Sequence, residues 1–173
     1  MKKVAVFLAF IFAVAQVAQA QTIGFVDSEG ILAKLPAYKK AQDQVNSIVD
    51  TWNKEIQQRY KNIDDAYKSF QAEQVLLSAT EKAKREQEIV DMEKQTRDLQ
   101  KQRFGPNGDL QAKREELVKP IQDEVYAALE KVAARKKVDF VFDKSASANM
   151  LFANPKFDLT DDVLKELGIS GGK

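Results

Sequence analysis

The sequence predicts a mainly α-helical protein in which a long antiparallel helical hairpin, a coiled-coil arm, projects from a small β body. Three observations predict this class. Chain-breaking residues are scarce, because residues 31–167 contain only two glycines and four prolines. Apolar residues recur at coiled-coil spacing along the middle of the chain. Short apolar segments of strand type lie on both sides of that helical region.

Residues 1–20 have the features of a secretory signal peptide. Lys2 and Lys3 precede an apolar run over residues 4–15, and the small residues Ala18 and Ala20 suit a signal peptidase. The run is too short to cross a membrane comfortably, since a spanning helix needs about 20 apolar residues. We therefore expect cleavage after Ala20 and a periplasmic mature protein. A retained membrane anchor is the alternative.

The composition narrows the function classes. The chain contains no Cys and no His, which removes thiol nucleophiles, imidazole bases, most zinc and copper sites and any disulfide framework. Loss of Lys2 and Lys3 leaves 25 basic against 26 acidic residues, so no one-sided basic surface is expected for nucleic acid. No phosphate-binding glycine loop is present. We expect no enzyme activity, no metal and no cofactor.

The first helix of the arm is predicted over residues 37–77. Its apolar positions step by three and four residues and then, from Trp52 to Ile63, by four, four and three. Such an eleven-residue step is a stutter, which locally unwinds a coiled coil so that its seam stays in line. The seam positions are Tyr38, Ala41, Val45, Ile48, Trp52, Ile56, Tyr60, Ile63, Tyr67 and Phe70.

The hairpin tip is predicted at residues 77–81. Ser78 followed by Glu81 is a capping box, which starts the return helix. That helix is expected to end near Lys136 or Lys137 and to be broken over residues 104–109, which contain Gly105, Pro106 and Gly108. Counting back from the tip places this break opposite the stutter.

The body is predicted from residues 21–36 and 120–168, with the arm over 37–119 and a tail over 169–173. Strands are expected at residues 23–27 and 138–143, a weaker one at 150–153, and an extension at 157–159, after which Thr160 caps a helix that Gly168 ends. So few short strands leave exposed edges, which predicts assembly with other copies. The candidate interface residues are Ile23, Phe25, Phe140, Phe142 and Leu151.

In this order the segments 23–34, 116–122, 140–145 and 158–164 resemble the Skp/OmpH family of periplasmic chaperones for outer membrane proteins. The resemblance implies a homotrimer with a β body and three helical tentacles around a cavity. It also implies that the cavity holds unfolded outer-membrane proteins without ATP until they reach the outer-membrane assembly machinery. Because the mature chain is near neutral, we carry over no lipid- or lipopolysaccharide-binding residues.

Two groups of arm residues are candidates for a function, one for client contact and one for a hinge. Apolar residues on an arm that holds clients should contact them weakly and adaptably, and the candidates are Tyr60, Tyr67, Phe70, Val75, Leu76 and Leu77. Seam residues at these positions could instead be core. Gly105, Pro106 and Gly108 are candidates for a hinge, or they only accommodate the stutter. The competing function is a structural coiled-coil spacer or adaptor of the bacterial envelope.

Overall fold

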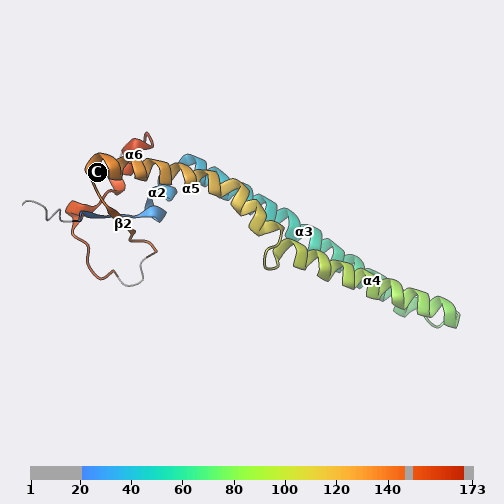
Figure 1. Ribbon diagram of the computed structural model, residues 1–173. Helices are drawn as coiled ribbons and strands as arrows, with labels where there is room; N and C mark the ends of the chain where they lie inside the picture. The colour runs from blue at the N-terminus through green and yellow to red at the C-terminus, as the bar shows by residue number, and fades with distance from the viewer. Residues whose placement is uncertain (1–20, 147–149, 170–173) are drawn as a thin grey trace, which may run out of the picture. The chain divides into compact units, whose positions relative to one another are not determined.

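The computed structural model describes residues 21–146 and 150–169, so the predicted leader and most of the predicted tail lie outside the described residues. It is mainly helical, with long helices and a small two-stranded sheet, which confirms the prediction of a mainly α-helical protein with a little sheet. The elements, in chain order, are β1 (Ile23–Val26), α2 (Ser28–Lys34), α3 (Pro36–Glu73), α4 (Ala79–Phe104), α5 (Asp109–Lys136), β2 (Phe140–Asp143), a 3₁₀ turn (Pro155–Phe157) and α6 (Thr160–Glu166) (Figure 1).

The chain divides into two compact units. The arm comprises residues 32–124 and contains α3, α4 and the first part of α5. The body comprises the described residues up to 31 and from 125 onward. Each unit is described separately.

In the arm, α3 and α4 form the long helical hairpin and lie side by side along α4 (Figure 1). Helix α3 starts with Pro36 in its first turn, where the missing N–H of proline is not needed. It ends at Glu73, four residues before the predicted end. Residues 74–77 form a turn, and Ser78, the N-cap of α4, then has an extended backbone with φ of −65° and ψ of 160°.

The tip is closed by the predicted capping box. The Glu81 backbone N–H donates to Ser78 Oγ over 3.3 Å, and the Ser78 backbone N–H donates to Glu81 Oε2 over 2.9 Å. Hydrogen bonding from the Ser78 side chain and backbone lowers the pKa of Glu81. Two otherwise unpaired N–H groups at the start of α4 are thereby satisfied.

The seam of the arm is narrow. Its buried side chains are Ala41, Val45, Ile56 and Ile63 of α3 and Ile89 and Thr96 of α4. Val45 and Ile56 are eleven positions apart, as a stutter requires. Trp52 contacts Phe104 edge-on, with ring centroids 5.9 Å apart. This contact brings the stutter against the break between α4 and α5, as the count from the tip predicts.

The body contains less sheet than predicted. β1 and β2 pair in parallel with Ile23 opposite Phe140 and Phe25 opposite Phe142. Among the described residues, the one further bridge to β1 joins Asp158 to Phe25. The prediction of a strand at residues 150–153 is wrong, because that segment has no regular structure. The 3₁₀ turn that follows it reduces the predicted extension at 157–159 to this single bridge.

The body core is closed by α6. Val163 and Leu164 of α6, Val132 of α5 and Ile31 of α2 are almost completely buried. The prediction that Thr160 caps α6 is wrong, because Thr160 is the first helical residue and Leu159 is the N-cap. The Thr160 hydroxyl instead accepts a hydrogen bond from the Asp27 backbone N–H over 3.0 Å and so joins α6 to the end of β1. Gly168 ends the helix region with φ of 76°, a left-handed conformation that glycine adopts freely.

Asp143, at the end of β2, ties the sheet to the start of α2. Its carboxylate accepts hydrogen bonds from the backbone N–H and the hydroxyl of Ser28 and from both groups of Ser145. Burial tends to raise the pKa of Asp143, but these hydrogen bonds outweigh it and lower the pKa from its ordinary value of 3.8.

The lowered pKa makes the body sensitive to acid. A carboxyl whose pKa is lower in the folded than in the unfolded state contributes stability above the unfolded value, and this contribution is lost as the pH falls through the folded-state value. We expect Asp143→Asn to reduce hydrogen-exchange protection of the β1 amides at about pH 6, and the difference from the unmodified protein to shrink at about pH 3. Asp98→Asn on exposed α4 is the control and should change nothing. A difference that persists unchanged at the lower pH would contradict this role.

Candidate functional site

The hairpin tip carries a small apolar patch, which we call the tip patch (Val75, Leu76 and Leu77). Val75 and Leu76 are 81% and 85% exposed, and Leu77 is half-buried. Helix α3 has already ended at Glu73, so these side chains lie in a turn and do not continue the helical seam. Exposed apolar residues grouped on an otherwise charged arm indicate a contact surface.

Farther along the arm, Tyr60 and Tyr67 of α3 border a shallow recess of about 330 Å³ between α3 and α4. Both tyrosines are about half exposed, and Phe70 is half-buried. The Tyr60 hydroxyl donates to Gln100 Oε1 over 3.2 Å, so this ring also links the two helices. The two tyrosines therefore lie at the rim of the seam, with the buried Ile63 and Ile89 in the same recess.

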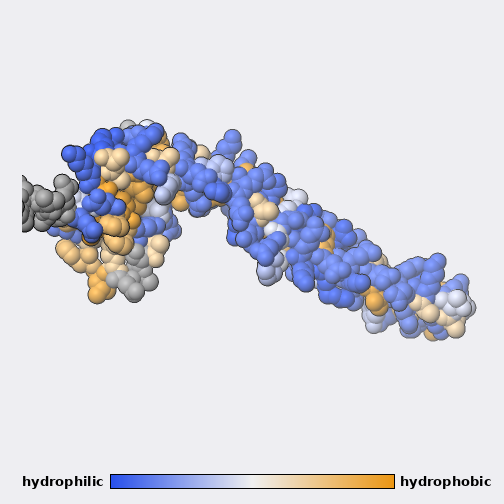
Figure 2. Space-filling view, in the orientation of Figure 1, coloured by the Kyte–Doolittle hydropathy of each residue, from blue (hydrophilic) through white to orange (hydrophobic). Residues whose placement is uncertain are grey.

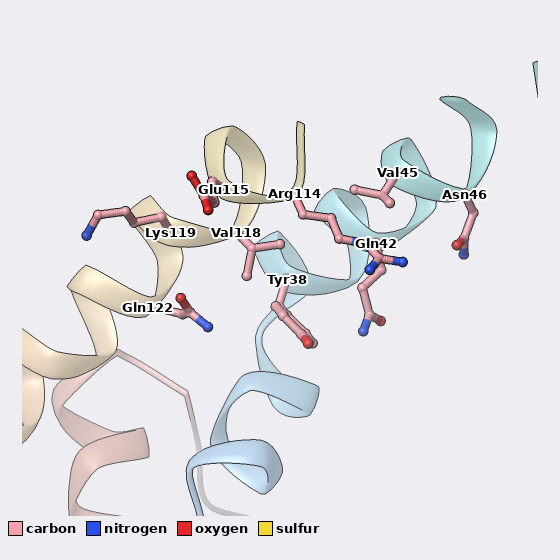
Figure 3. Close-up of a pocket in the computed structure, with 9 residues that line it drawn as sticks. All are labelled: Tyr38, Gln42, Val45, Asn46, Arg114, Glu115, Val118, Lys119 and Gln122. Carbon is pink, nitrogen blue, oxygen red and sulfur yellow. The ribbon is translucent and has the colours of Figure 1, made fainter. Parts of the chain in front are cut away.

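A larger groove lies between α3 and α5 within the arm and has a volume of about 920 Å³. Figure 3 shows Arg114 and Val118 extending from α5 toward α3. The lining combines apolar side chains, three amides and charges of both signs: Tyr38, Gln42, Val45, Asn46, Arg114, Glu115, Val118, Lys119 and Gln122. Among the described residues the side chains of Gln42, Asn46 and Gln122 make no hydrogen bonds to other residues, which leaves their donors and acceptors available.

Sequence reasoning did not find this groove. Its two walls are separated by about seventy residues, and the predicted seam placed Tyr38 and Val45 in a helix–helix contact. The sequence signal that could have indicated the groove is the pair of amide residues beside the seam. Gln42 and Asn46 are four residues apart and therefore lie on one face of α3.

The predicted hinge residues form a tight loop between Phe104 and Asp109. A side chain at Gly105 would place its Cβ 2.3 Å from the Lys101 carbonyl oxygen, and one at Gly108 would place it 2.6 Å from the Gln102 carbonyl oxygen. The left-handed residue of the loop is Asn107, with φ of 57°. Both glycines are thus required because the loop lies directly on the last turn of α4. Replacement of either glycine by Ala would change the structure of the loop, so it would not test the flexibility of the loop alone.

The predicted interface residues of the body differ in exposure. Ile23, Phe140 and Phe142 are about half exposed and Leu151 is 99% exposed, whereas Phe25 is buried within its own chain. The register of the sheet puts all four of these strand residues, Ile23, Phe25, Phe140 and Phe142, on one face. Phe152 is also 82% exposed. Figure 2 shows the resulting apolar area on the body, in contrast to the mainly hydrophilic surface of the arm.

Other classes of site are not seen in residues 21–146 and 150–169. No group of acidic side chains in these ranges is arranged to hold a metal ion. None of the helices described there is long and apolar enough to cross a membrane.

The exposure of the tip patch distinguishes it from the seam. We expect Val75→Ser with Leu76→Ser to change the free energy of unfolding by no more than about 0.5 kcal/mol, as for other exposed substitutions. Ile63→Ala, which empties a buried seam position, should cost about 2–4 kcal/mol. Urea unfolding at one fixed chain concentration measures both. A large loss of stability in the tip variant would show that the patch is core.

Comparison with known proteins agrees with this architecture. The family described as "Outer membrane protein (OmpH-like)" matches residues 22–167. An uncharacterised protein of Aquifex aeolicus (strain VF5) is 30% identical over 161 residues, which cover 93% of this chain and 94% of that protein. A crystal structure from Caulobacter crescentus CB15, of a protein proposed to be an OmpH-like outer membrane chaperone, superposes with a TM-score of 0.70 at 15% identity over 88% of both chains. With its helical arm, two-stranded sheet and near full-length match, the chain belongs to the OmpH-like outer membrane protein family.

Proposed function

We propose that this protein is an ATP-independent periplasmic holdase that binds unfolded outer-membrane proteins and prevents their aggregation before membrane insertion. Its family is one of chaperones and not of enzymes. The observation that carries the proposal is the exposed tip patch on a long and otherwise charged arm. Such a surface offers apolar contact without forming a deep pocket for one ligand.

Weak and distributed contacts suit an unfolded client. A client that must later fold elsewhere cannot be held by one high-affinity site, because release would then be slow. The tip patch and the Tyr60–Tyr67 recess are separate small surfaces along the arm. Several such contacts on one tethered arm add through effective concentration while each one stays weak.

The groove of Figure 3 adds a polar component to this surface. The amides of Gln42, Asn46 and Gln122 can each donate and accept hydrogen bonds. An extended client segment has unpaired backbone N–H and C=O groups, which these amides can bind regardless of client sequence. Val45 and Val118 in the same groove supply apolar contact.

Assembly is part of the proposal. The half-exposed Ile23, Phe140 and Phe142, with the fully exposed Leu151, form more apolar surface than a small body would leave in water. A shared trimeric body would cover it, and several arms would then surround one client. The leader, cleaved after Ala20, would deliver the chain to the periplasm, from which clients pass to the outer-membrane assembly machinery.

The direct test is light scattering from a urea-denatured outer-membrane barrel diluted into buffer without ATP. We expect the protein to suppress scattering at near-stoichiometric amounts. Val75→Ser with Leu76→Ser should weaken suppression by about tenfold, because two exposed apolar contacts are lost. Gln57→Ser with Lys61→Ser, also exposed on α3, is the control. If the unmodified protein has no effect on scattering, the spacer or adaptor function is favoured instead.

The assembly is tested by the mass of the particle in solution. We expect three chains per particle. Phe140→Ser with Phe142→Ser should release single chains with their helical content retained, because these two side chains are half exposed within one chain and the proposed assembly would bury their exposed part. An unmodified protein that is a folded monomer would exclude the shared body.

A further inference from the structure

One side chain joins three helices at the break in the arm. Arg103 lies in the last turn of α4, its guanidinium carbon is 4.6 Å from the centroid of the Trp52 ring of α3, and its Nη1 donates to Asp109 Oδ2 of α5 over 2.7 Å. We call Trp52, Arg103 and Asp109 the Arg103 latch. All three residues belong to the arm.

The latch spans a segment where the helical backbone is interrupted. Residues 105–108 separate α4 from α5, so no continuous helical hydrogen-bond ladder fixes the direction of α5. The loop is held by bonds such as the Gly108 backbone N–H to the Gly105 carbonyl at 2.9 Å, and Gln102 Nε2 donates across it to Asp109 Oδ2 over 3.3 Å. Side-chain contacts across the break therefore have to set the orientation of α5 relative to α4.

The closed latch combines favourable contacts with one unfavourable feature. Its ion pair is partly exposed, with Arg103 and Asp109 side chains 28% and 36% exposed, so salt can reach it, and a guanidinium over an indole ring adds cation–π attraction. However, Arg103 Nε is buried without a hydrogen-bond partner, which costs free energy. This cost is relieved when the side chain leaves, so the closed state is only moderately favoured.

Arg103 and Asp109 also interact favourably with the dipoles of their own helices. Arg103 lies at the C-terminal end of α4 and Asp109 in the first turn of α5. Each charge therefore has the sign that its own helix dipole favours. Each charge keeps this interaction whether the latch is closed or open, so opening loses the ion pair but not the dipole interaction, and the loss becomes smaller when salt screens the ion pair.

We propose that the Arg103 latch is a salt-sensitive conformational switch that holds α5 in one orientation relative to α4 when closed and allows the arm to bend when open. The inference goes beyond client holding and does not depend on it. It assigns the control of the joint to Arg103, whereas Gly105 and Gly108 only permit the tight loop.

The chain is well suited to a direct test, because it contains no Cys and one Trp. Spin labels on Lys94→Cys in α4 and Ala112→Cys in α5, both exposed positions, report the distance across the break. Labelled chains are diluted with unlabelled chains so that one pair is measured per particle. Acrylamide quenching of Trp52 gives an independent readout of whether the ring is covered.

In the unmodified protein at low salt we expect one narrow distance distribution and a shielded Trp52. Arg103→Gln should raise the population of other distances about two- to fivefold, as expected for the loss of one cation–π contact, and should increase quenching of Trp52. Raising the salt to about 0.5 M should broaden the distribution of the unmodified protein but leave that of Arg103→Gln unchanged, since the screened ion pair is already absent there.

Two further variants keep the test specific. Arg97→Gln removes the Arg97–Glu93 pair, 3.3 Å apart on the same helix, and should behave as the unmodified protein. Arg103→Lys keeps the charge but loses the planar stack and should give an intermediate distribution. The switch is overturned if Arg103→Gln, with its helical content intact, gives the same narrow distribution as the unmodified protein. It is also overturned if salt broadens both distributions equally.

Discussion

The arm depends on one constraint, which is that two helices bury a seam only about one side chain wide. The buried residues of α3 are Ala41, Val45, Ile56 and Ile63. Those of α4 are Ile89 and Thr96. A narrow seam supplies little hydrophobic free energy per residue, so it must stay in line over the whole hairpin. Thr96 meets this demand by donating its hydroxyl to the Met92 carbonyl at 2.8 Å, which satisfies its only buried polar group.

The joint follows from the same constraint. The eleven-residue step on α3 changes the local winding of the pair, and at that point the Trp52 ring meets Phe104 and Arg103. The return helix stops there, at Phe104. Its loop folds back so closely on Lys101 and Gln102 that only glycine fits at residues 105 and 108. The break is therefore a compact structure with its own contacts, and a cation and an anion on its two sides connect the helices that it separates.

Exposed apolar surface is divided between the two units in different ways. On the described arm it consists of the tip patch, the tyrosines at the rim of the seam and Val90 of α4, on a surface that is mainly hydrophilic. On the body it includes Phe140 and Phe142 on one sheet face, and also Tyr126, Leu151 and Phe152 outside the sheet. The first distribution suits weak contacts with changing partners, and the second suits one permanent partner of complementary shape.

The sequence by itself determined the helical hairpin, its tip at Ser78 and Glu81, and the place of the break, because periodicity, capping and chain-breaking residues are local signals. It misplaced the strand at 150–153 and the role of Thr160, whose hydroxyl bonds to a residue more than one hundred positions away. Only the tertiary structure decided that Arg103 lies on Trp52 and that Gln42 and Gln122 share a groove. These contacts join residues distant in the chain, and no local propensity records which side chains a folded hairpin will bring together.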